Sequence, residues 1–457
     1  MGMIYFYPLK NKFVRGVDLT MTREEPFSGL TLTGRSVGNI KSHNLRAVLL
    51  TLLHQGPTSR VRLTQLTGLS STTITNLTAD LLAQGIIAET GKEEPADARG
   101  GNGRTGAGRP ATLVSIRPTA RFAVGIHFGV DTIRVGVTDL FGKLHSYQVI
   151  SHPIEIAPQD LLERAVGLVE EMIGRAGAQR GDLVGLGVGA SGLVDPDTGV
   201  NVLAPNLGWR NIPMRQFFAD RTGLPVMVDN NVRAMALAEA MFGAGRGVNT
   251  LAFVYGRVGV GAGFVVGGNV YRGSRAGAGE IGHTTMIPAG GAPCRCGNTG
   301  CLETLVSEPE LVRQARVLAA RAPDSLLAAL LDRSAGEPNP NDANGGSPAE
   351  TPIEQVFAAA RGGDRGALEL LDQAAIYLGT ALANLVNLVN PDMIILGGMF
   401  AAGADLFLPR VEETMRRRSF AGLGEQVALR VTTFGRKVGV IGAAALALDA
   451  FFYRQEA

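Results

Sequence analysis

The stretch that decides the fold reads Glu280-Ile-Gly-His283, followed by Cys294-Arg-Cys296-Gly-Asn-Thr-Gly-Cys301-Leu-Glu303. It holds all three cysteines of the 457-residue chain. Three thiols and one imidazole are the donors that a closed tetrahedral zinc site uses. The alternatives are three unrelated thiols or one disulfide with a cysteine left over, but disulfide scaffolds are typical of small, cysteine-rich secreted chains. We therefore expect a structural zinc ion held by His283, Cys294, Cys296 and Cys301.

The bulk composition favours a large α/β protein without a global charge signature. A chain of 457 residues is long for one domain and indicates two or three. Its 61 glycines and 6% aromatic residues fit an α/β protein with many tight turns better than a β-sandwich. Since the net charge is only +2, any role in nucleic-acid binding has to reside in a local segment.

The two ends of the sequence lack the pattern of a secreted or membrane protein. The N-terminal residues do not combine a basic, an apolar and a small-residue region, as a signal peptide does. The longest apolar run near the C-terminus, residues 438–452, is short and contains Asp449. We expect a cytoplasmic protein with no membrane partner, in a compartment that keeps metal-binding thiols reduced.

Residues 41–117 are predicted to form a winged helix-turn-helix domain. Its elements, in chain order, are helices over 44–55, 60–67 and 71–83, with a tight turn at 68–70, then strands from 86 and over 111–116. Within it, residues 91–108 are rich in glycine and charge and are expected to be a flexible wing or linker. Residues 1–40 show no sustained period and are expected to be a disordered extension.

From residue 122 onward, short apolar strands alternate with helical segments, which is typical of α/β folds. The pattern occurs twice, and we place a first half at 120–240 and a second half at 241–450. Residues 335–352 are rich in Pro, Asn, Gly and Ser and interrupt helical sequence, so we expect a flexible surface insertion there.

The string from Gly279 to Glu303 closely resembles the zinc-binding consensus of the ROK family, which comprises repressors, open reading frames and sugar kinases. With further motifs described below, the resemblance covers about residues 40–450. It implies a two-lobed α/β body of the sugar kinase/actin-like (ribonuclease H-like) class, preceded by the winged helix-turn-helix domain. The open question is whether the chain is an enzyme or a regulator.

The predicted third helix is the candidate DNA-reading element. Residues 41–92 carry five basic and two acidic side chains, a local net charge of +3 that suits phosphate contacts. Small hydroxyl and amide side chains on the outer face of this helix can approach base edges in a major groove. These candidates are Thr72, Thr73, Thr75 and Asn76. The alternatives are an ordinary polar helix face, or a winged helix that binds protein.

A second DNA contact is expected at Gly108-Arg109-Pro110, which matches a short segment that regulators of the family carry at the wing. An extended arginine can enter a narrow minor groove, where the negative potential is enhanced. A plain linker arginine is the alternative for Arg109.

The resemblance also implies a sugar pocket. Asn206-Leu-Gly-Trp209 matches a family element whose asparagine contacts the sugar, and Glu280 and Glu303 correspond to residues that accept hydrogen bonds from sugar hydroxyls. Amides and carboxylates suit a polyol because each hydroxyl both donates and accepts. The expected sugar-binding residues are Asn206, Asn230, Asn231, Glu280, His283 and Glu303.

The catalytic base of the kinase branch is missing. Where those kinases carry Asn-Asp, this chain reads Asp229-Asn230-Asn231, so Asn231 occupies the position of the base. An amide cannot take a proton from a hydroxyl, and loss of a general base costs about 10²–10⁴-fold in rate. We predict no catalytic residue here and interpret Asp229 as a support.

The nucleotide half of the kinase motifs is altered as well. His127 stands where the kinases carry the aspartate that would interact with magnesium. Val130 and Asp131 follow at the point where the backbone must approach phosphate; Val130 adds a Cβ there, and Asp131 brings a like charge. The second phosphate motif, residues 257–263, keeps its glycines but lacks the threonine hydroxyl. A glycine pattern alone is weak evidence for nucleotide binding.

These observations predict a sugar-responsive transcriptional regulator, a repressor of carbohydrate-utilisation genes with a non-catalytic kinase-like body. Operator DNA and a monosaccharide or derivative are its expected partners, and a homodimer or homotetramer is its expected assembly. An active ATP-dependent sugar kinase of the hexokinase or glucokinase type is the main alternative. A sensor that is controlled by a transporter rather than by free sugar is another.

Overall fold

The computed structural model describes residues 37–92, 111–153, 156–333 and 351–454. Arg109 lies outside these residues, as do most of the predicted extension (1–40), wing (91–108) and insertion (335–352). Within the described residues, no helix has the length and apolar character needed to cross a membrane.

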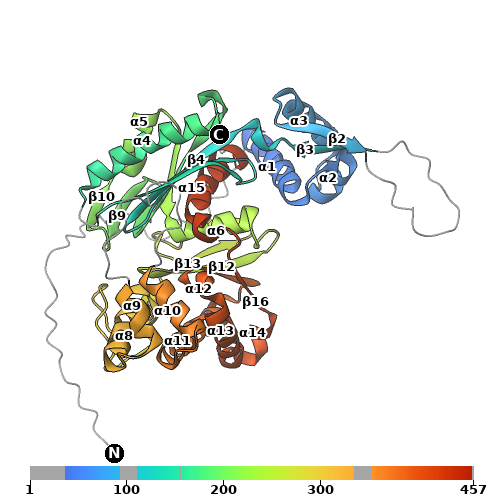
Figure 1. The fold of residues 1–457 in the computed structure, drawn as a ribbon. Helices are drawn as coiled ribbons and strands as arrows, with labels where there is room; N and C mark the ends of the chain where they lie inside the picture. The colour runs from blue at the N-terminus through green and yellow to red at the C-terminus, as the bar shows by residue number, and fades with distance from the viewer. Residues whose placement is uncertain (1–36, 93–110, 154–155, 334–350, 455–457) are drawn as a thin grey trace, which may run out of the picture.

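The N-terminal domain has the element order and sheet of a winged helix. Its elements are α1 (Val37–Gln55), β1 (Thr58–Ser59), α2 (Arg60–Thr67), α3 (Ser71–Ala83), β2 (Ile87–Lys92) and β3 (Thr112–Ile116), with antiparallel strand order β1-β3-β2. The side chains of Ser59 and Ser70 accept backbone N–H bonds at the starts of α2 and α3. Figure 1 shows this domain beside the two-lobed body.

Helix α1 begins earlier than the prediction of 44–55. It starts at Val37, and Ile40, the first residue of the helix whose side chain is described, is 48% exposed. Since apolar periodicity reports only turns that pack on a core, it could not indicate these first turns.

The first lobe is built on a five-stranded sheet with strand order β11-β7-β4-β5-β6. Its strands are β4 (Phe122–Phe128), β5 (Thr132–Asp139), β6 (Leu144–Ser151), β7 (Leu183–Ala190) and β11 (Val226–Asn230). A small sheet adds β8 (Leu193–Asp195), β9 (Val200–Ala204) and β10 (Trp209–Ile212). The lobe's remaining elements are η1 (Pro118–Ala120), α4 (Pro158–Ala176), η2 (Arg180–Asp182) and α5 (Met214–Thr222). Apolar side chains of α4 and α5 share one buried core with this sheet.

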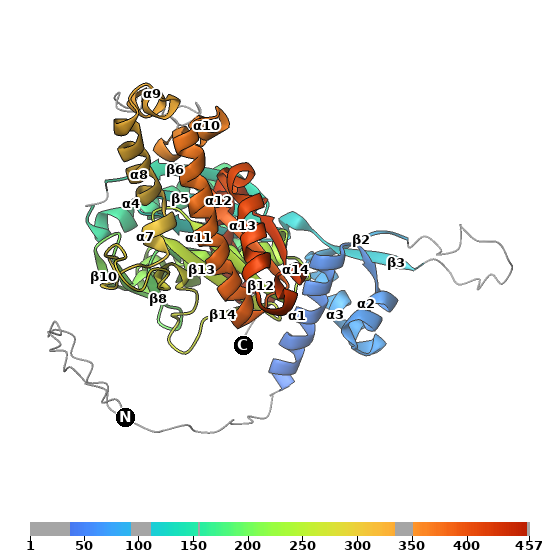
Figure 2. The same cartoon turned by 90° about the horizontal axis from the view of Figure 1, so that it is seen from below.

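The second lobe contains a five-stranded sheet with order β14-β13-β12-β15-β16. Its strands are β12 (Thr250–Gly256), β13 (Val260–Val266), β14 (Asn269–Tyr271), β15 (Met393–Gly398) and β16 (Ala428–Val431). The associated helices are α6 (Asn231–Phe242), η3 (Ile281–His283), α7 (Glu303–Val306), α8 (Glu308–Arg321), α9 (Leu326–Arg333), α10 (Pro352–Arg361), α11 (Arg365–Val389), α12 (Met399–Ala402), α13 (Ala404–Arg418), η4 (Phe420–Gly422), α14 (Leu423–Gln426) and η5 (Gly435–Lys437). Figure 2 shows α8, α9 and α10 at the end of the body that lies away from the N-terminal domain.

The C-terminal helix α15 (Val438–Leu448) does not stay with the second lobe. It returns to the first sheet and packs on β4 and β7 and along α6, so residues 241–450 are not one continuous lobe as predicted. Gly125 and Gly187 permit this approach, because a Cβ on either would collide with the helix backbone at Val440 or Ala443. The chain then forms the π-helical turn η6 (Asp449–Tyr453), which contacts α1.

Candidate functional site

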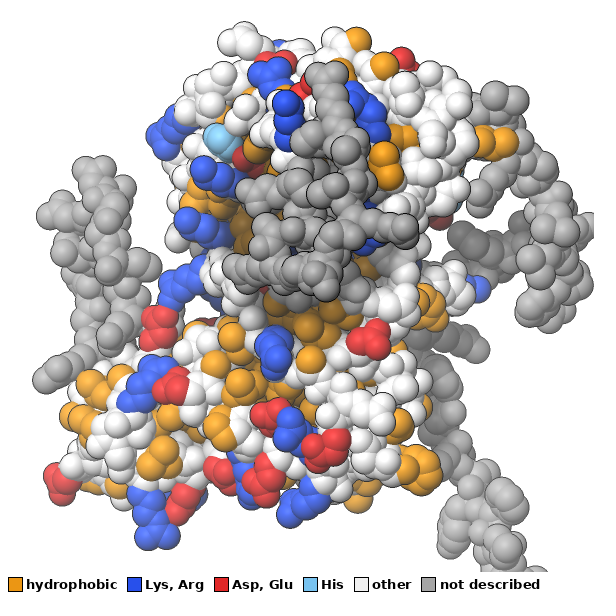
Figure 3. All heavy atoms as spheres, turned by 90° about the vertical axis from the view of Figure 1, so that its right-hand side faces the viewer, with side chains coloured by type: hydrophobic (Ala, Val, Ile, Leu, Met, Phe, Trp, Pro, Cys, Tyr) orange, Lys and Arg blue, Asp and Glu red, His pale blue; other side chains and the backbone are white. Residues whose placement is uncertain are grey.

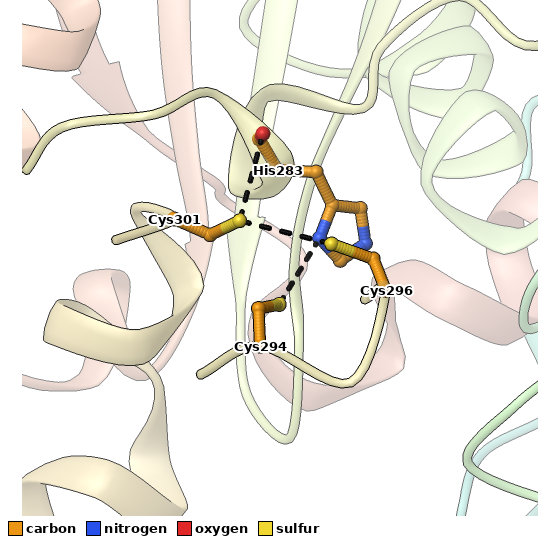
Figure 4. A group of neighbouring side chains, drawn as sticks. All are labelled: His283, Cys294, Cys296 and Cys301. Carbon is orange, nitrogen blue, oxygen red and sulfur yellow. Dashed lines mark hydrogen bonds between the residues drawn. The ribbon is translucent and has the colours of Figure 1, made fainter. Parts of the chain in front are cut away.

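The three cysteines and His283 converge on one point. Their ligand atoms all lie within 4.8 Å of one another, and none of the cysteines is in a disulfide. Cys294 Sγ is 3.6 Å from His283 Nδ1, and Cys296 Sγ is 3.7 Å from Cys301 Sγ (Figure 4). The four residues predicted as ligands thus form a group that could hold a metal ion.

The surroundings of this group fit a soft divalent cation. The other ring nitrogen of His283, Nε2, lies 4.0 Å from a Glu280 carboxylate oxygen, so Nδ1 is left to face the thiols. A carboxylate beside the second nitrogen of a metal-ligating histidine orients the ring and makes the first nitrogen a more basic metal ligand. Burial raises the pKa of the Cys301 thiol, so this sulfur is a neutral thiol unless a cation stabilises its thiolate.

Predicted sugar-site residues from both lobes meet around Gly259. Asn206 comes from the turn between β9 and β10, Glu303 begins α7, and Gly259 lies in the turn between β12 and β13. A Cβ on Gly259 would lie 2.8 Å from Glu303 Oε2 and 3.9 Å from Asn206 Nδ2. The Glu303 carboxylate also accepts the Val260 N–H at 3.0 Å, which fixes its position.

Asn230 and Asn231 are held in different ways at the start of α6. Asn230 Oδ1 accepts the N–H groups of Val232 and Arg233, and its amide donates to the Gly192 carbonyl at 2.9 Å. Its oxygen is therefore engaged in capping the helix. The Asn231 amide donates to Ser191 Oγ at 3.2 Å, which leaves its carbonyl oxygen as an acceptor for a hydroxyl.

Asp229 is the centre of a buried ion-pair network directly before these asparagines. Its side chain is fully buried, and it accepts from Arg233 Nε at 2.7 Å and Arg272 Nε at 2.8 Å. Arg233 also donates to the Ala276 carbonyl, so the network ties β11 and α6 to the segment that follows β14. Both carboxylate oxygens of Asp229 therefore accept hydrogen bonds from arginines.

A hollow of about 350 Å³ lies between the lobes at the start of α15. Its lining includes His127, Arg134, Arg257 and Glu308. His127 is only 4% exposed, and neither ring nitrogen has a hydrogen-bond partner among the described residues. Burial, and then the charges of Arg134 and Arg257, lower the pKa of His127 to about 3, so the ring is neutral.

An ion pair crosses this cleft. Arg257, after β12, donates from both Nη atoms to the carboxylate of Asp131, between β4 and β5, at 2.8 and 2.6 Å. Although burial alone would raise it, the pKa of Asp131 is lowered by its hydrogen bonds from Arg257. The two loops that the family resemblance assigns to phosphate are therefore bridged by protein side chains.

The candidate DNA-contacting residues on α3 are largely accessible. Thr72, Thr75 and Asn76 are exposed, whereas Thr73 is half-buried and its hydroxyl lies 2.9 Å from that of Ser70. Among the described residues of the domain, 37–92 and 111–117, both acidic side chains are paired with basic ones, in Lys41–Asp80 and Arg60–Glu89. In Figure 3, Lys and Arg side chains predominate on the upper part of the visible face, and the lower part mixes both signs.

Comparisons with a family profile, with characterised relatives and with solved structures show which proteins the chain is similar to. The ROK family profile matches residues 123–450. The xylose repressor of Caldicellulosiruptor bescii is 29% identical, with 90% of this chain and 96% of that protein covered. The glucokinase of Halalkalibacterium halodurans is 33% identical over 70% of this chain and 93% of its own. A crystal structure of a ROK family transcriptional regulator, a homologue of the Escherichia coli MLC protein, superposes with a TM-score of 0.73 at 27% identity, covering 91% and 98% of the two chains.

Fold and site together define a two-lobed α/β protein of the sugar-kinase type with a winged-helix N-terminal domain. The chain belongs to the ROK family. Both regulators align over about nine-tenths of it, whereas the glucokinase aligns over a share no longer than the body.

Sequence reasoning missed several residues of the cleft. Ser191 holds Asn231, Arg272 pairs with Asp229, and Arg295 donates to Asn206. Only Arg295 had a signal in the sequence, since it stands between two predicted metal ligands. The others become neighbours of the site only through the fold.

Proposed function

We propose that the protein is a sugar-responsive transcriptional repressor of carbohydrate-utilisation genes. One observation carries the proposal. A winged-helix domain is joined to a sugar-kinase-like body in which Asn231, an amide, occupies the position of the kinase base. Operator DNA would bind at α3, and a monosaccharide or derivative would bind among Asn206, Asn231, Glu303 and Glu280.

The altered nucleotide side supports a body that binds sugar without phosphorylating it. Phosphoryl transfer needs a positioned nucleophile and charge stabilisation of the transferred group. Here the Asp131–Arg257 pair spans the two phosphate loops, and neutral, buried His127 replaces the magnesium aspartate. A ligand phosphate would have to compete with Asp131 for Arg257.

The packing offers a route from the sugar cleft to the DNA-binding domain. Asn231 begins α6, α6 packs along α15, and the end of α15 continues into η6, which contacts α1. Arg246, just after α6, donates to the His54 carbonyl at the end of α1. Sugar would control DNA binding if it prefers one arrangement of these helices, since a ligand shifts an equilibrium only by its differential affinity.

We further propose that the His283 group binds structural zinc, because three sulfurs and one nitrogen leave no open position for catalysis. A cytoplasmic homodimer or homotetramer would present two α3 helices to neighbouring half-sites.

The proposal is tested by fluorescence anisotropy with the DNA upstream of the gene and of adjacent sugar genes. We expect salt-sensitive binding with a Kd of about 10⁻⁸ M or tighter, changed by D-xylose, D-glucose or another monosaccharide of a panel. ADP release is measured with the same sugars. Absence of specific DNA binding, together with turnover at about 1–10³ s⁻¹, would identify a kinase instead.

Substitutions on α3 should weaken operator binding. Thr72→Ala and Asn76→Ala are each expected to cost about 1–3 kcal/mol if the side chain reads a base. Gln84→Ala, at the opposite end of the same helix, serves as the control and should leave the Kd unchanged. If all three variants bind the operator with the Kd of the wild type, the DNA contact lies on another surface.

Restoring the missing carboxylate should not create a kinase. In Asn231→Asp, a base is returned, but the Asp131–Arg257 pair and His127 still occupy the nucleotide side. We expect ADP release to stay at the background measured without sugar. A rise of about 10²-fold or more, the range of a general base, would contradict this account of the nucleotide side.

A further inference from the structure

Arg295 connects the metal-binding loop of the second lobe to a sugar-site residue of the first. It stands between Cys294 and Cys296, and its Nη1 donates a 2.8 Å hydrogen bond to Asn206 Oδ1. Asn206 lies between β9 and β10, which belong to the small sheet of the first lobe. The bond therefore joins the two lobes close to Glu303.

This bond fixes which way the Asn206 amide faces. A guanidinium has only donors, so the amide must turn its carbonyl oxygen to Arg295. Its NH₂ group faces Gly259, since Nδ2 is 3.9 Å from the point where a Cβ of that glycine would lie. The same point is 2.8 Å from Glu303 Oε2. The two lobes thus bring an amide donor and a carboxylate acceptor close to the same point beside Gly259.

We propose that Arg295 is a positioning residue that sets the ligand preference of the cleft. The inference rests on the proposed function and names the ligand class of that site, a neutral polyol with a free hydroxyl between Asn206 and Glu303. That hydroxyl accepts from the Asn206 NH₂ and donates to the Glu303 carboxylate. Without Arg295 the amide can rotate and present its oxygen toward Glu303, where two acceptors would face one hydroxyl.

The first test is calorimetric titration of the full-length protein with D-xylose, D-glucose and their monodeoxy analogues. Arg295→Ala is expected to weaken binding of the preferred sugar by about tenfold or more, the effect of losing a hydrogen bond to a charged group. It should also reduce the difference in Kd between that sugar and the deoxy analogue that lacks the hydroxyl paired with Asn206 and Glu303. Arg295→Lys keeps one charged donor and should recover part of the affinity. Thr299→Ala, in the same loop, is the matched control.

The second test is a double-mutant cycle with Asn206→Ala. If Arg295 acts through the Asn206 amide, Arg295→Ala should have no further effect on Kd in the Asn206→Ala background. If Arg295 has a merely structural role, the losses of binding free energy in the two single variants add in the double variant, and Arg295→Ala has a lowered melting temperature. That result would overturn the inference. Equal affinities of wild type and Arg295→Ala would also overturn it, while leaving the proposed function intact. Failure of the wild type to bind any sugar of the panel would overturn both.

Discussion

Replacing Arg233 with methionine is expected to destabilise the protein by about 3–5 kcal/mol, because the change leaves a carboxylate buried with an incomplete set of partners. Arg233 is 2% exposed and donates to Asp229, whose side chain is fully buried. It also donates to the Ala276 and Val194 carbonyls, so three acceptors lose a donor at once. Methionine fills much of the volume, so the loss reports on charge and hydrogen bonding rather than on a cavity.

Urea unfolding followed by circular dichroism measures the effect. Arg313→Met is the control, since its pair with Glu310 is at the surface and the arginine side chain is 63% exposed; such pairs contribute about 0–1 kcal/mol. The double variant Asp229→Asn, Arg233→Met removes the stranded charge as well and should recover part of the stability. If Arg233→Met and Arg313→Met unfold at the same urea concentration, the network has no special role in stability.

Local structure was predictable wherever the signal lies within a few residues. Helices over 60–67 and 71–83 were predicted with the bounds that α2 and α3 show, because Ser59 and Ser70 cap their starts and Gly68 takes a left-handed conformation after α2. The candidate metal group was equally predictable, since three of its four residues fall within residues 294–301 and glycines with positive φ at 297 and 300 let the loop fold back.

Contacts between distant segments were not predictable in this way. Asp131 and Arg257 are 126 residues apart, and Asn206 and Arg295 are 89 apart. Neither pair has a local pattern, because each depends on how the two lobes face one another. The substitutions at His127 and Asp131 showed that the nucleotide side was altered, but not that an ion pair spans it.

The return of α15 to the first lobe has a signal in the sequence, namely the apolar character of the whole helix. Residues 438–452 are apolar apart from Asp449, and only the shortness of this run and Asp449 entered the prediction, as evidence against a membrane span. A helix that is apolar all round is buried on several faces, so it must be covered by more than one element. Here the first sheet and α6 cover it, and Gly442 is needed for the close approach to Ala234.

Loss of the proposed zinc ion from the His283 group should loosen the proposed sugar site before it affects the DNA-binding domain. Cys301 is fully buried, and Glu303, two residues later, projects its carboxylate beside Gly259. When the free zinc concentration is a hundred times the Kd of the site, zinc binding stabilises the folded protein by about 2.7 kcal/mol. We therefore expect Cys301→Ser to lack stoichiometric zinc, to lose at least that much stability, and to bind sugar more weakly, while its Kd for operator DNA without sugar is unchanged.

Zinc content is measured by atomic absorption, sugar affinity by calorimetry and DNA affinity by anisotropy on the same preparations. Thr299→Ala, whose side chain is outside the metal group, is the control and should match the wild type in all three. Treating the wild type with a chelator should reproduce the Cys301→Ser result, and adding zinc back should reverse it in the wild type alone. Because the metal group lies beside Glu303 and far along the chain from α3, a variant without zinc that still responds fully to sugar would show that the metal does not support the cleft. Equal loss of sugar and DNA binding would instead indicate that the ion holds the whole fold together.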